Sequence, residues 1–309
     1  MADGSTKVIY AALTGNVLVA VSKFIAAALS GSSAMLTEAV HSSADCVNQV
    51  LLLIGNRRSR APADESHPFG YGAEIYFWAS IVAVMVLIVG GVASVYEGVL
   101  QFRHPEPVRS FAVSVGVLAL SALFEGASLL YSLREYRRIV AARPIPGQTI
   151  GLWRFIKMSK DPNLYESILE DSAALIGIGI ATFGVVGNAC LGWLWADGAA
   201  SVLIGLLLCA VSWVIAEATR RLAAGEPVAT PTRLILERTL DTSPAIRGYK
   251  ELRTLQLGPR TILVTLTIQL PSSQSVDELR RSLGQLTEEI KAADSRCEYV
   301  FFRLDEAPN

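Results

Sequence analysis

The amino-acid sequence predicts a polytopic α-helical membrane protein with six transmembrane helices and a C-terminal α+β domain in the cytoplasm. Three observations support this fold class. Of the 309 residues, 51% are hydrophobic and only 18% are charged, whereas soluble domains average roughly 25% charged residues. The apolar residues form long runs, each reaching the ~20 residues needed to cross a bilayer. After Ala224 the composition becomes that of a soluble domain.

Six apolar runs are the expected spans: residues 8–30, 34–56, 75–100, 111–133, 164–187 and 196–218. We therefore expect a transmembrane domain over residues 1–222 and a separate domain over residues 223–309. Arginine and lysine gather after the second, fourth and sixth runs and are scarce in the other loops. By the positive-inside rule, both termini should face the cytoplasm, as in a multi-pass protein of the cell (inner) membrane.

The C-terminal domain should contain alternating helices and strands. The expected elements are a helix over 230–240, strands over 250–257 and 261–270, a helix over 275–293 and a strand over 298–304. Thr230 and Pro231 suit the N-cap and first position of the first helix. Ser275 and Glu278 fit a capping box that begins the second helix. This α-β-β-α-β order predicts a small ferredoxin-like sheet with helices on one face.

Charge and motif content exclude several classes of function. The net charge is −1 and the chain has no basic run, so nucleic acid is not an expected partner. The four cysteines are too scattered for a disulfide framework or a cysteine zinc cage. They are Cys46, Cys190, Cys209 and Cys297. Neither HExxH nor GxSxG occurs, and we do not expect an enzyme.

The second run carries a polar stripe. Glu38, His41, Asp45 and Asn48 fall within an arc of about 80° on a helix. Each ionisable group at the centre of a span costs ~2.5–3.5 kcal/mol, so such a stripe requires a reason. His41 and Asp45, four residues apart, could hold one divalent ion together. The alternative is a hydrogen-bonded pair that only fastens helices to one another.

The fifth run is also acidic. Ser167, Glu170 and Asp171 share a face about 100° wide. Because the second and fifth helices run in opposite directions, Asp171 could meet His41 and Asp45 near mid-depth. One imidazole with two or three carboxylates suits a first-row divalent cation. Like charges in an empty cluster favour protonation, so metal binding would release protons, which is the physical basis of metal–proton exchange.

Further ionisable residues lie within or beside the runs, among them Glu125, Lys23 and Asp197. For Glu125, in the fourth run, a packing hydrogen bond and a role in an ion path are equally plausible. Lys23 lies nearer the end of its span, from where its amine could snorkel to the interface. Asp197 begins the sixth span, where an acidic residue suits a helix N-terminus.

These residues resemble the cation diffusion facilitator family over nearly the whole chain. The motifs that carry the resemblance are LTEAVHSSAD (36–45) and HPFGYGAE (67–74). Residues 45–49, 124–128 and 169–174 are similar to its divergent zinc-transporter branch. The resemblance implies a homodimeric secondary transporter that exports zinc, manganese, iron or cobalt against protons. It also implies a tetrahedral site between the second and fifth spans, and dimerisation through the C-terminal domain.

Two positions depart from the family pattern. Relatives place His or Asp four residues before the acid of the fifth span, where this chain has Ser167. Either Glu170 substitutes or water completes the site, and losing an imidazole shifts the preference from zinc toward manganese or iron. In the loop after the second span, Tyr71 replaces the second histidine of a metal site that some relatives have, so we expect His67 to shape a turn.

The sequence thus predicts a proton-coupled efflux transporter of divalent metal cations, with zinc the first candidate and manganese, iron or cobalt the others. Its expected metal ligands are His41, Asp45, Asp171 and Glu170, with Asn48, Glu125, Glu38 and Ser167 as candidates along the ion path. The expected partners are a second copy of the chain, the transported ion, protons and the lipid bilayer, with no cofactor. The alternative is a membrane-embedded metal-binding or assembly subunit that does not transport.

Overall fold

The computed structural model describes residues 2–142, 149–269 and 275–304 and divides into two compact units. The first unit comprises Met1–Gly55, Phe77–Glu135 and Asn163–Thr219. The second comprises Asn56–Tyr76, Tyr136–Pro162 and Arg220–Asn309.

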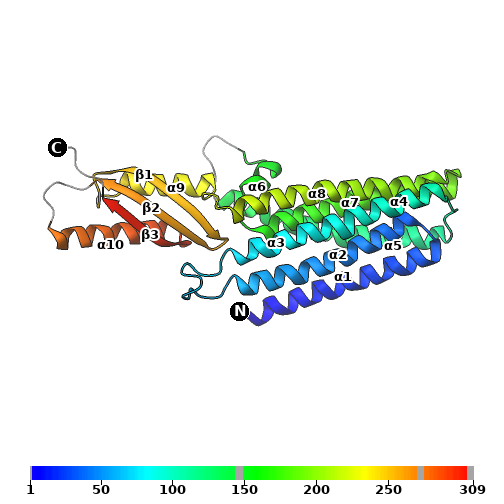
Figure 1. Cartoon of the computed structure of the whole chain (residues 1–309), viewed down its shortest axis with the longest axis horizontal. Helices are drawn as coiled ribbons and strands as arrows, with labels where there is room; N and C mark the ends of the chain where they lie inside the picture. Colours follow the sequence, from blue (N-terminus) through cyan, green and yellow to red (C-terminus); the bar gives the residue numbers. More distant parts are fainter. Residues whose placement is uncertain (1, 143–148, 270–274, 305–309) are drawn as a thin grey trace. The chain divides into compact units, whose positions relative to one another are not determined.

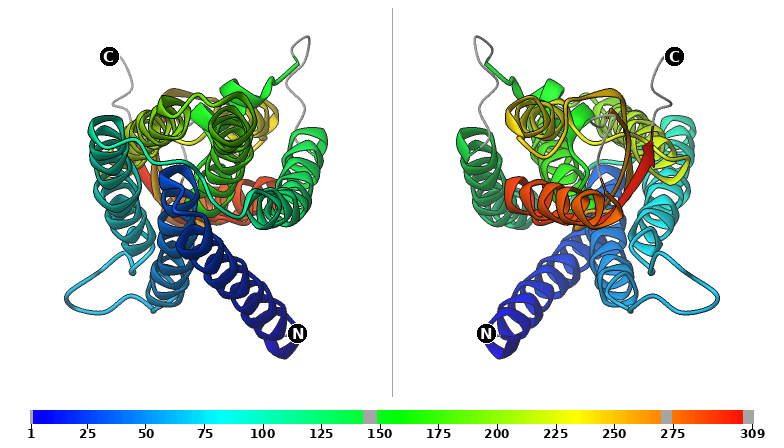
Figure 2. Two further views of the ribbon diagram at one scale, coloured as in Figure 1. Left: turned by 90° about the vertical axis from the view of Figure 1, so that its right-hand side faces the viewer. Right: turned by 90° about the vertical axis from the view of Figure 1, so that its left-hand side faces the viewer.

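Long helices make up the first unit and lie alongside one another (Figure 1). They are α1 (Ala2–Ser30), α2 (Ser33–Arg58), α3 (Glu74–Met85), a π-helical segment (Val86–Val92), α4 (Ala93–Arg103), α5 (Phe111–Ala142), α7 (Pro162–Leu191) and α8 (Trp195–Ala223). The end-on views show α1, in blue, leaning outward at its N-terminal end (Figure 2).

Five of these helical segments are long and apolar enough to cross a membrane. They are Leu13–Ser30, Glu74–Arg103, Phe111–Ala142, Pro162–Leu191 and Trp195–Ala223. The 26 residues of α2 extend about 39 Å, more than the ~30 Å of a hydrocarbon core. Its polar stripe makes α2 less apolar than the other five. A polytopic helical membrane protein is therefore confirmed, and α2 lies within the length range of these five segments but is less apolar.

Glycines allow α4 and α8 to approach closely. A Cβ atom added to Gly98 of α4 would lie 2.7 Å from the carbonyl oxygen of Gly198 and 2.7 Å from the backbone nitrogen of Val202, both on α8. A Cβ on Gly205 would lie 2.7 Å from the nitrogen of Val95. In lipid, the hydrophobic effect does not drive helices together, because the lipid tails are as apolar as the side chains. Helices there usually associate through small residues that let their backbones approach closely.

Asp197 joins the first turns of two helices. It lies in the first turn of α8, as the sequence predicts. Its Oδ1 accepts a hydrogen bond from Ser32 Oγ, and its Oδ2 accepts hydrogen bonds from the backbone nitrogen of Ser33 at 2.6 Å and from Ser33 Oγ at 3.0 Å. The carboxylate therefore also caps the N-terminus of α2, whose first N–H groups have no partner within the helix.

The second unit contains the C-terminal sheet. Its elements are α9 (Thr230–Thr242), β1 (Gly248–Gly258), β2 (Thr261–Gln269), α10 (Val276–Ala293) and β3 (Cys297–Leu304). The strand order is β1-β2-β3, with β1 and β2 antiparallel and β2 and β3 parallel. The two helices contact each other, and α9 packs on β1 while α10 packs on β3. They therefore cover one face of the sheet, and the predicted α-β-β-α-β order is confirmed.

Burial follows the strand period in this domain. Alternate residues of β2 point into one core with side chains of both helices. The central members of this core are Leu236, Leu240, Ile262, Val264, Leu266, Ile268, Leu286 and Ile290. The predicted capping box of Ser275 and Glu278 is present. The predicted N-cap was wrong by one residue, since Ala229 is the N-cap of α9 and Thr230 is already helical.

The loop between α2 and α3 packs on the sheet within the second unit. The Phe69 ring lies edge-on to Tyr299 and Phe301 of β3, with ring centres 5.2 and 6.4 Å apart. Gly72 approaches the β1–β2 turn so closely that an added Cβ would lie 2.8 Å from the Leu257 carbonyl oxygen. A short helix, α6 (Leu152–Met158), follows α5 in the chain; it buries Phe155 and exposes Trp153.

Candidate metal site

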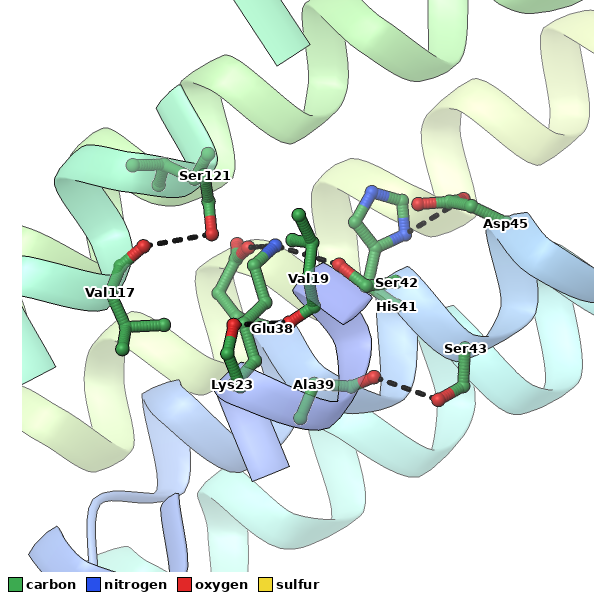
Figure 3. Close-up of polar contacts among 12 residues, drawn as sticks. Val19, Lys23, Glu38, Ala39, His41, Ser42, Ser43, Asp45, Val117 and Ser121 are labelled. Carbon is green, nitrogen blue, oxygen red and sulfur yellow. Dashed lines mark hydrogen bonds and ion pairs between the residues drawn. The ribbon is translucent and has the colours of Figure 1, made fainter. Parts of the chain in front are cut away.

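His41 and Asp45 lie near the middle of α2, as the sequence predicts. Their side chains are adjacent, with His41 Nδ1 3.6 Å from Asp45 Oδ1 (Figure 3). The His41 side chain is 1% exposed and that of Asp45 is 16% exposed. The spacing of four residues on a continuous helix produces this arrangement.

Neither residue satisfies its polar atoms within the part of the chain that the structure describes. Both ring nitrogens of His41 and Oδ1 of Asp45 are buried without a hydrogen-bond partner there. Buried polar atoms in proteins are almost always hydrogen-bonded, because an unpaired one costs ~1–3 kcal/mol. Three such atoms at one place point to a ligand that shares them, and imidazole nitrogen with carboxylate oxygen suits a divalent metal ion.

The last residue of the polar stripe on α2, Asn48, contacts α7. Asn48, fully buried, donates a hydrogen bond from Nδ2 to Oε1 of Glu170 at 2.9 Å. The two helices predicted to carry the ligands are therefore in direct polar contact.

Asp171 faces α5 as well as its own helix. Its Oδ2 accepts a hydrogen bond from Ser128 of α5 at 2.8 Å and a longer one from Ser167 at 3.4 Å. Ser167 and Ser132 share a further hydrogen bond of 2.9 Å. Glu125 lies on α5 one turn before Ser128, half-buried. Ser167 thus contacts the candidate ligand directly.

These groups are close to one another but do not form one cage in this structure. Among the described residues, no three His, Cys, Asp or Glu side chains come close enough together to hold a metal ion. The candidates are instead divided into the His41–Asp45 pair, the Glu170 carboxylate held by Asn48, and the Asp171 carboxylate held by serines. A four-ligand site requires these side chains to come closer together, and it stays a prediction.

Sequence reasoning missed the role of Lys23. It does not snorkel: Lys23 and Glu38 are both fully buried, and Lys23 Nζ lies 3.0 Å from Glu38 Oε2 (Figure 3). The spacing of residues around the turn between α1 and α2 could have predicted this pair. Lys23 stands eight residues before Gly31 and Glu38 seven residues after it, so antiparallel helices bring them to the same depth.

The loop after α2 contains a hydrogen-bonded turn at Asp64. Its carboxylate accepts hydrogen bonds from the hydroxyls of Ser66 and Tyr71 and from the backbone nitrogen of His67. These hydrogen bonds, that of Ser66 first, lower the pKa of Asp64 to about 2. Gly70 donates its backbone hydrogen bond to the His67 carbonyl oxygen. The expectation that His67 shapes a turn is confirmed.

Comparison with known proteins shows which family the chain is similar to. Residues 9–222 match the model of the cation efflux transmembrane domain. The proton-coupled zinc antiporter SLC30A9, mitochondrial, of Mus musculus is 31% identical over 255 residues, which are 82% of this chain and 44% of that protein. The chain thus spans less than half the length of this relative.

Two further relatives come from a plant and a bacterium. Metal tolerance protein C4 of Arabidopsis thaliana is 28% identical over 283 residues, 91% of this chain and 60% of that protein. Zinc transporter ZitB of Escherichia coli (strain K12) is 24% identical over 257 residues, 81% of this chain and 73% of that protein.

Proposed function

The chain belongs to the cation efflux family, in its zinc-transporter branch, and we propose that it exchanges a divalent metal ion for protons across a membrane. The observation that carries the proposal is the buried His41–Asp45 pair, whose two ring nitrogens and one carboxylate oxygen have no hydrogen-bond partner among the described residues. A transported cation supplies the partner that these atoms lack.

Proton coupling follows from the acids that surround this pair. Glu125, Glu170 and Asp171 lie on α5 and α7, beside the stripe of α2. Carboxylates that are close to one another and poorly solvated repel, so protons neutralise them when no metal is present. A divalent ion requires deprotonated ligands and displaces those protons as it binds. Metal and protons therefore compete for the same groups, which is the requirement for exchange.

Zinc is the first candidate for the transported ion. The relatives SLC30A9 and ZitB are named as zinc transporters, and His41 provides the imidazole that zinc favours. With a single histidine and several carboxylates, the ligand set also admits manganese, iron or cobalt. His41, Asp45 and Asp171 are the proposed ligands, and Glu170 is the proposed fourth.

The proposed protein crosses the membrane six times, with α2 as the span that carries the site. The distribution of arginine and lysine supports cytoplasmic termini, in the inner membrane of the cell. The C-terminal domain is proposed to have a ferredoxin-like fold and to form a homodimer by packing, since it contains no histidine to build a shared metal site. The protein moves its substrate without converting it chemically, and is not an enzyme.

Reconstitution tests the proposal. The purified chain in proteoliposomes should show zinc uptake coupled to proton movement, reported by a zinc-sensitive and a pH-sensitive dye. His41→Ala and Asp45→Ala should abolish both signals while the protein remains folded by gel filtration. His67→Ala is the matched control, because that histidine is exposed in a loop, and it should retain activity.

Two results would contradict transport at this site. Full activity in Asp45→Ala would remove the central pair from the mechanism. Tight zinc binding by the wild-type chain, with no flux of zinc or protons, would favour the alternative of a metal-binding or assembly subunit.

A further inference from the structure

A buried ion pair lies one helical turn from the candidate ligands. The ammonium of Lys23 on α1 contacts Glu38 Oε2 at 3.0 Å and Ser42 Oγ at 2.7 Å, both on α2 (Figure 3). Lys23 and Glu38 are 0% exposed, and Ser42 is buried beside His41. Two charges fully removed from water are costly to keep, so a pair at this place calls for a function.

Glu38 has a second carboxylate oxygen that Lys23 does not bind. It stands three residues before His41, on the same face of α2. Its second oxygen, Oε1, is buried and has no hydrogen-bond partner among the described residues. This oxygen points toward α7, where a Cβ on Gly177 would lie 2.7 Å from it. The ammonium thus occupies one oxygen of a carboxylate that could otherwise join the proposed site.

Charge near a transport site affects release as much as binding. The site already has acidic residues on three helices: Asp45 on α2, Glu125 on α5, and Glu170 and Asp171 on α7. Another free carboxylate on α2 would hold a doubly charged ion more tightly, because Coulomb attraction is strong where water is scarce. A transporter must bind its ion weakly enough to let it go.

We propose that Lys23 is a tethered counter-cation that keeps Glu38 out of the metal ligand set and thereby limits the affinity of the transport site. Its role is positioning and specificity: the ammonium neutralises Glu38, holds it toward α1, and places a positive charge beside the bound ion. The inference rests on the proposed metal transport, and it deepens that proposal by naming the residue that sets how readily the ion leaves.

Three variants of the full chain test this: Lys23→Gln, Glu38→Gln and the double variant. Zinc binding is measured in detergent by competition with a chromogenic chelator, and zinc-driven proton flux is measured in proteoliposomes. Lys23→Gln frees Glu38 and should bind zinc about tenfold or more tightly, with a lower KM and a lower maximal rate. Glu38→Gln leaves the ammonium unopposed and should bind zinc more weakly.

The double variant separates charge from packing. It lacks the lysine but restores neutrality, so its zinc affinity and maximal rate should return to near the wild-type values. If the single and double variants lose activity equally with unchanged affinity, Lys23 is only structural and the inference is overturned. If Lys23→Gln does not fold, Glu38→Gln decides, and wild-type zinc affinity in that variant overturns the inference.

The two proposals fail in different ways. A wild-type chain that moves no metal overturns the transport function, whatever the variants do. Wild-type transport with equal zinc affinity in all variants overturns only the role of Lys23.

Discussion

Asn48 of α2 donates a hydrogen bond to Glu170 of α7 across 2.9 Å, and this contact joins the two helices that carry the proposed ligands. Because Asn48 has an amide and not a charge, it holds the carboxylate without neutralising it. Oδ1 of Asn48 is buried and has no hydrogen-bond partner among the described residues, so a second donor or a cation can bind there.

This contact allows two functions of Glu170 to be separated. Glu170→Gln keeps an oxygen that can accept from Asn48 but removes the charge, so thermal stability should stay near that of the wild type. Zinc affinity should fall about tenfold or more, because a charged ligand is lost. Glu170→Leu also leaves Asn48 without its partner and should lower the free energy of unfolding by about 1–3 kcal/mol.

The measurements are thermal unfolding and zinc titration of the purified variants. Wild-type zinc affinity in Glu170→Gln would exclude Glu170 as a ligand. Ser167 or a water molecule would then complete the site.

A second prediction concerns the metal preference. Ser167 Oγ lies 3.4 Å from Asp171 Oδ2, so a histidine at position 167 would place a second imidazole beside this carboxylate. Ser167→His should raise the preference for zinc over manganese by about tenfold or more, because nitrogen ligands favour zinc. Competition between the two ions in the uptake assay measures this ratio.

Ser172→His is the matched control for that variant. Ser172 hydrogen-bonds to the Ile168 carbonyl oxygen and lies about 100° round the helix from Asp171, so its replacement should leave the ratio unchanged. An equal shift in both variants would mean that position 167 does not face the ion.

The third prediction tests the close packing of α4 and α8. A Cβ at Gly98 would lie 2.7 Å from backbone atoms of Gly198 and Val202, and backbone cannot rotate away. Gly98→Ala should therefore lower the free energy of unfolding by about 1–3 kcal/mol. Gly126→Ala on α5 is the control, since an added Cβ meets nothing within 4 Å. Thermal unfolding in detergent should distinguish them, and equal midpoints would refute the close contact.

The fourth prediction concerns acid stability of the loop around Asp64. Hydrogen bonds hold its pKa at about 2, below the usual value of about 3.9. A lowered pKa means that the carboxylate stabilises the turn above the unfolded value, and that this contribution is lost as pH falls through the folded value. Pepsin should therefore cut the loop slowly near pH 4 and faster toward pH 2.

Asp64→Asn is the comparison for that experiment. It lacks the charge at every pH, so pepsin should cut its loop rapidly already near pH 4. Equal cutting of the wild-type chain and the variant at pH 4 would show that the carboxylate does not hold the turn.

How far the sequence predicts the structure depends on whether a feature is local. The stripe of Glu38, His41, Asp45 and Asn48 follows from helix geometry alone, and the capping box at Ser275 follows from residue spacing. Contacts between helices depend also on how each helix is rotated about its axis. Residue spacing does not give that rotation, so the partners of Asp171 on α5 were not foreseen.

Lys23 shows a second reason for failure. Its position near a helix end favours snorkelling when the helix is considered alone. The fold supplies Glu38 and Ser42 as partners, and these outweigh access to water. The π-helical segment at Val86–Val92 could likewise not be predicted from the hydropathy of this run. A π-helical turn changes the backbone hydrogen bonding, and it leaves the apolar composition of the run as it is.

The carboxylate of Asp197, bonded to Ser32 and Ser33, fastens one tip of α2 to α8. If α2 tilts as a rigid helix about this contact, each residue is displaced in proportion to its distance from it. At 1.5 Å per residue, His41 stands about 12 Å from this contact and Arg58 about 38 Å. Such a tilt, if it shifts His41 by 1 Å, would displace the C-terminal end of α2 by about 3 Å, so a slight adjustment at the ion becomes a larger one at that end of the helix.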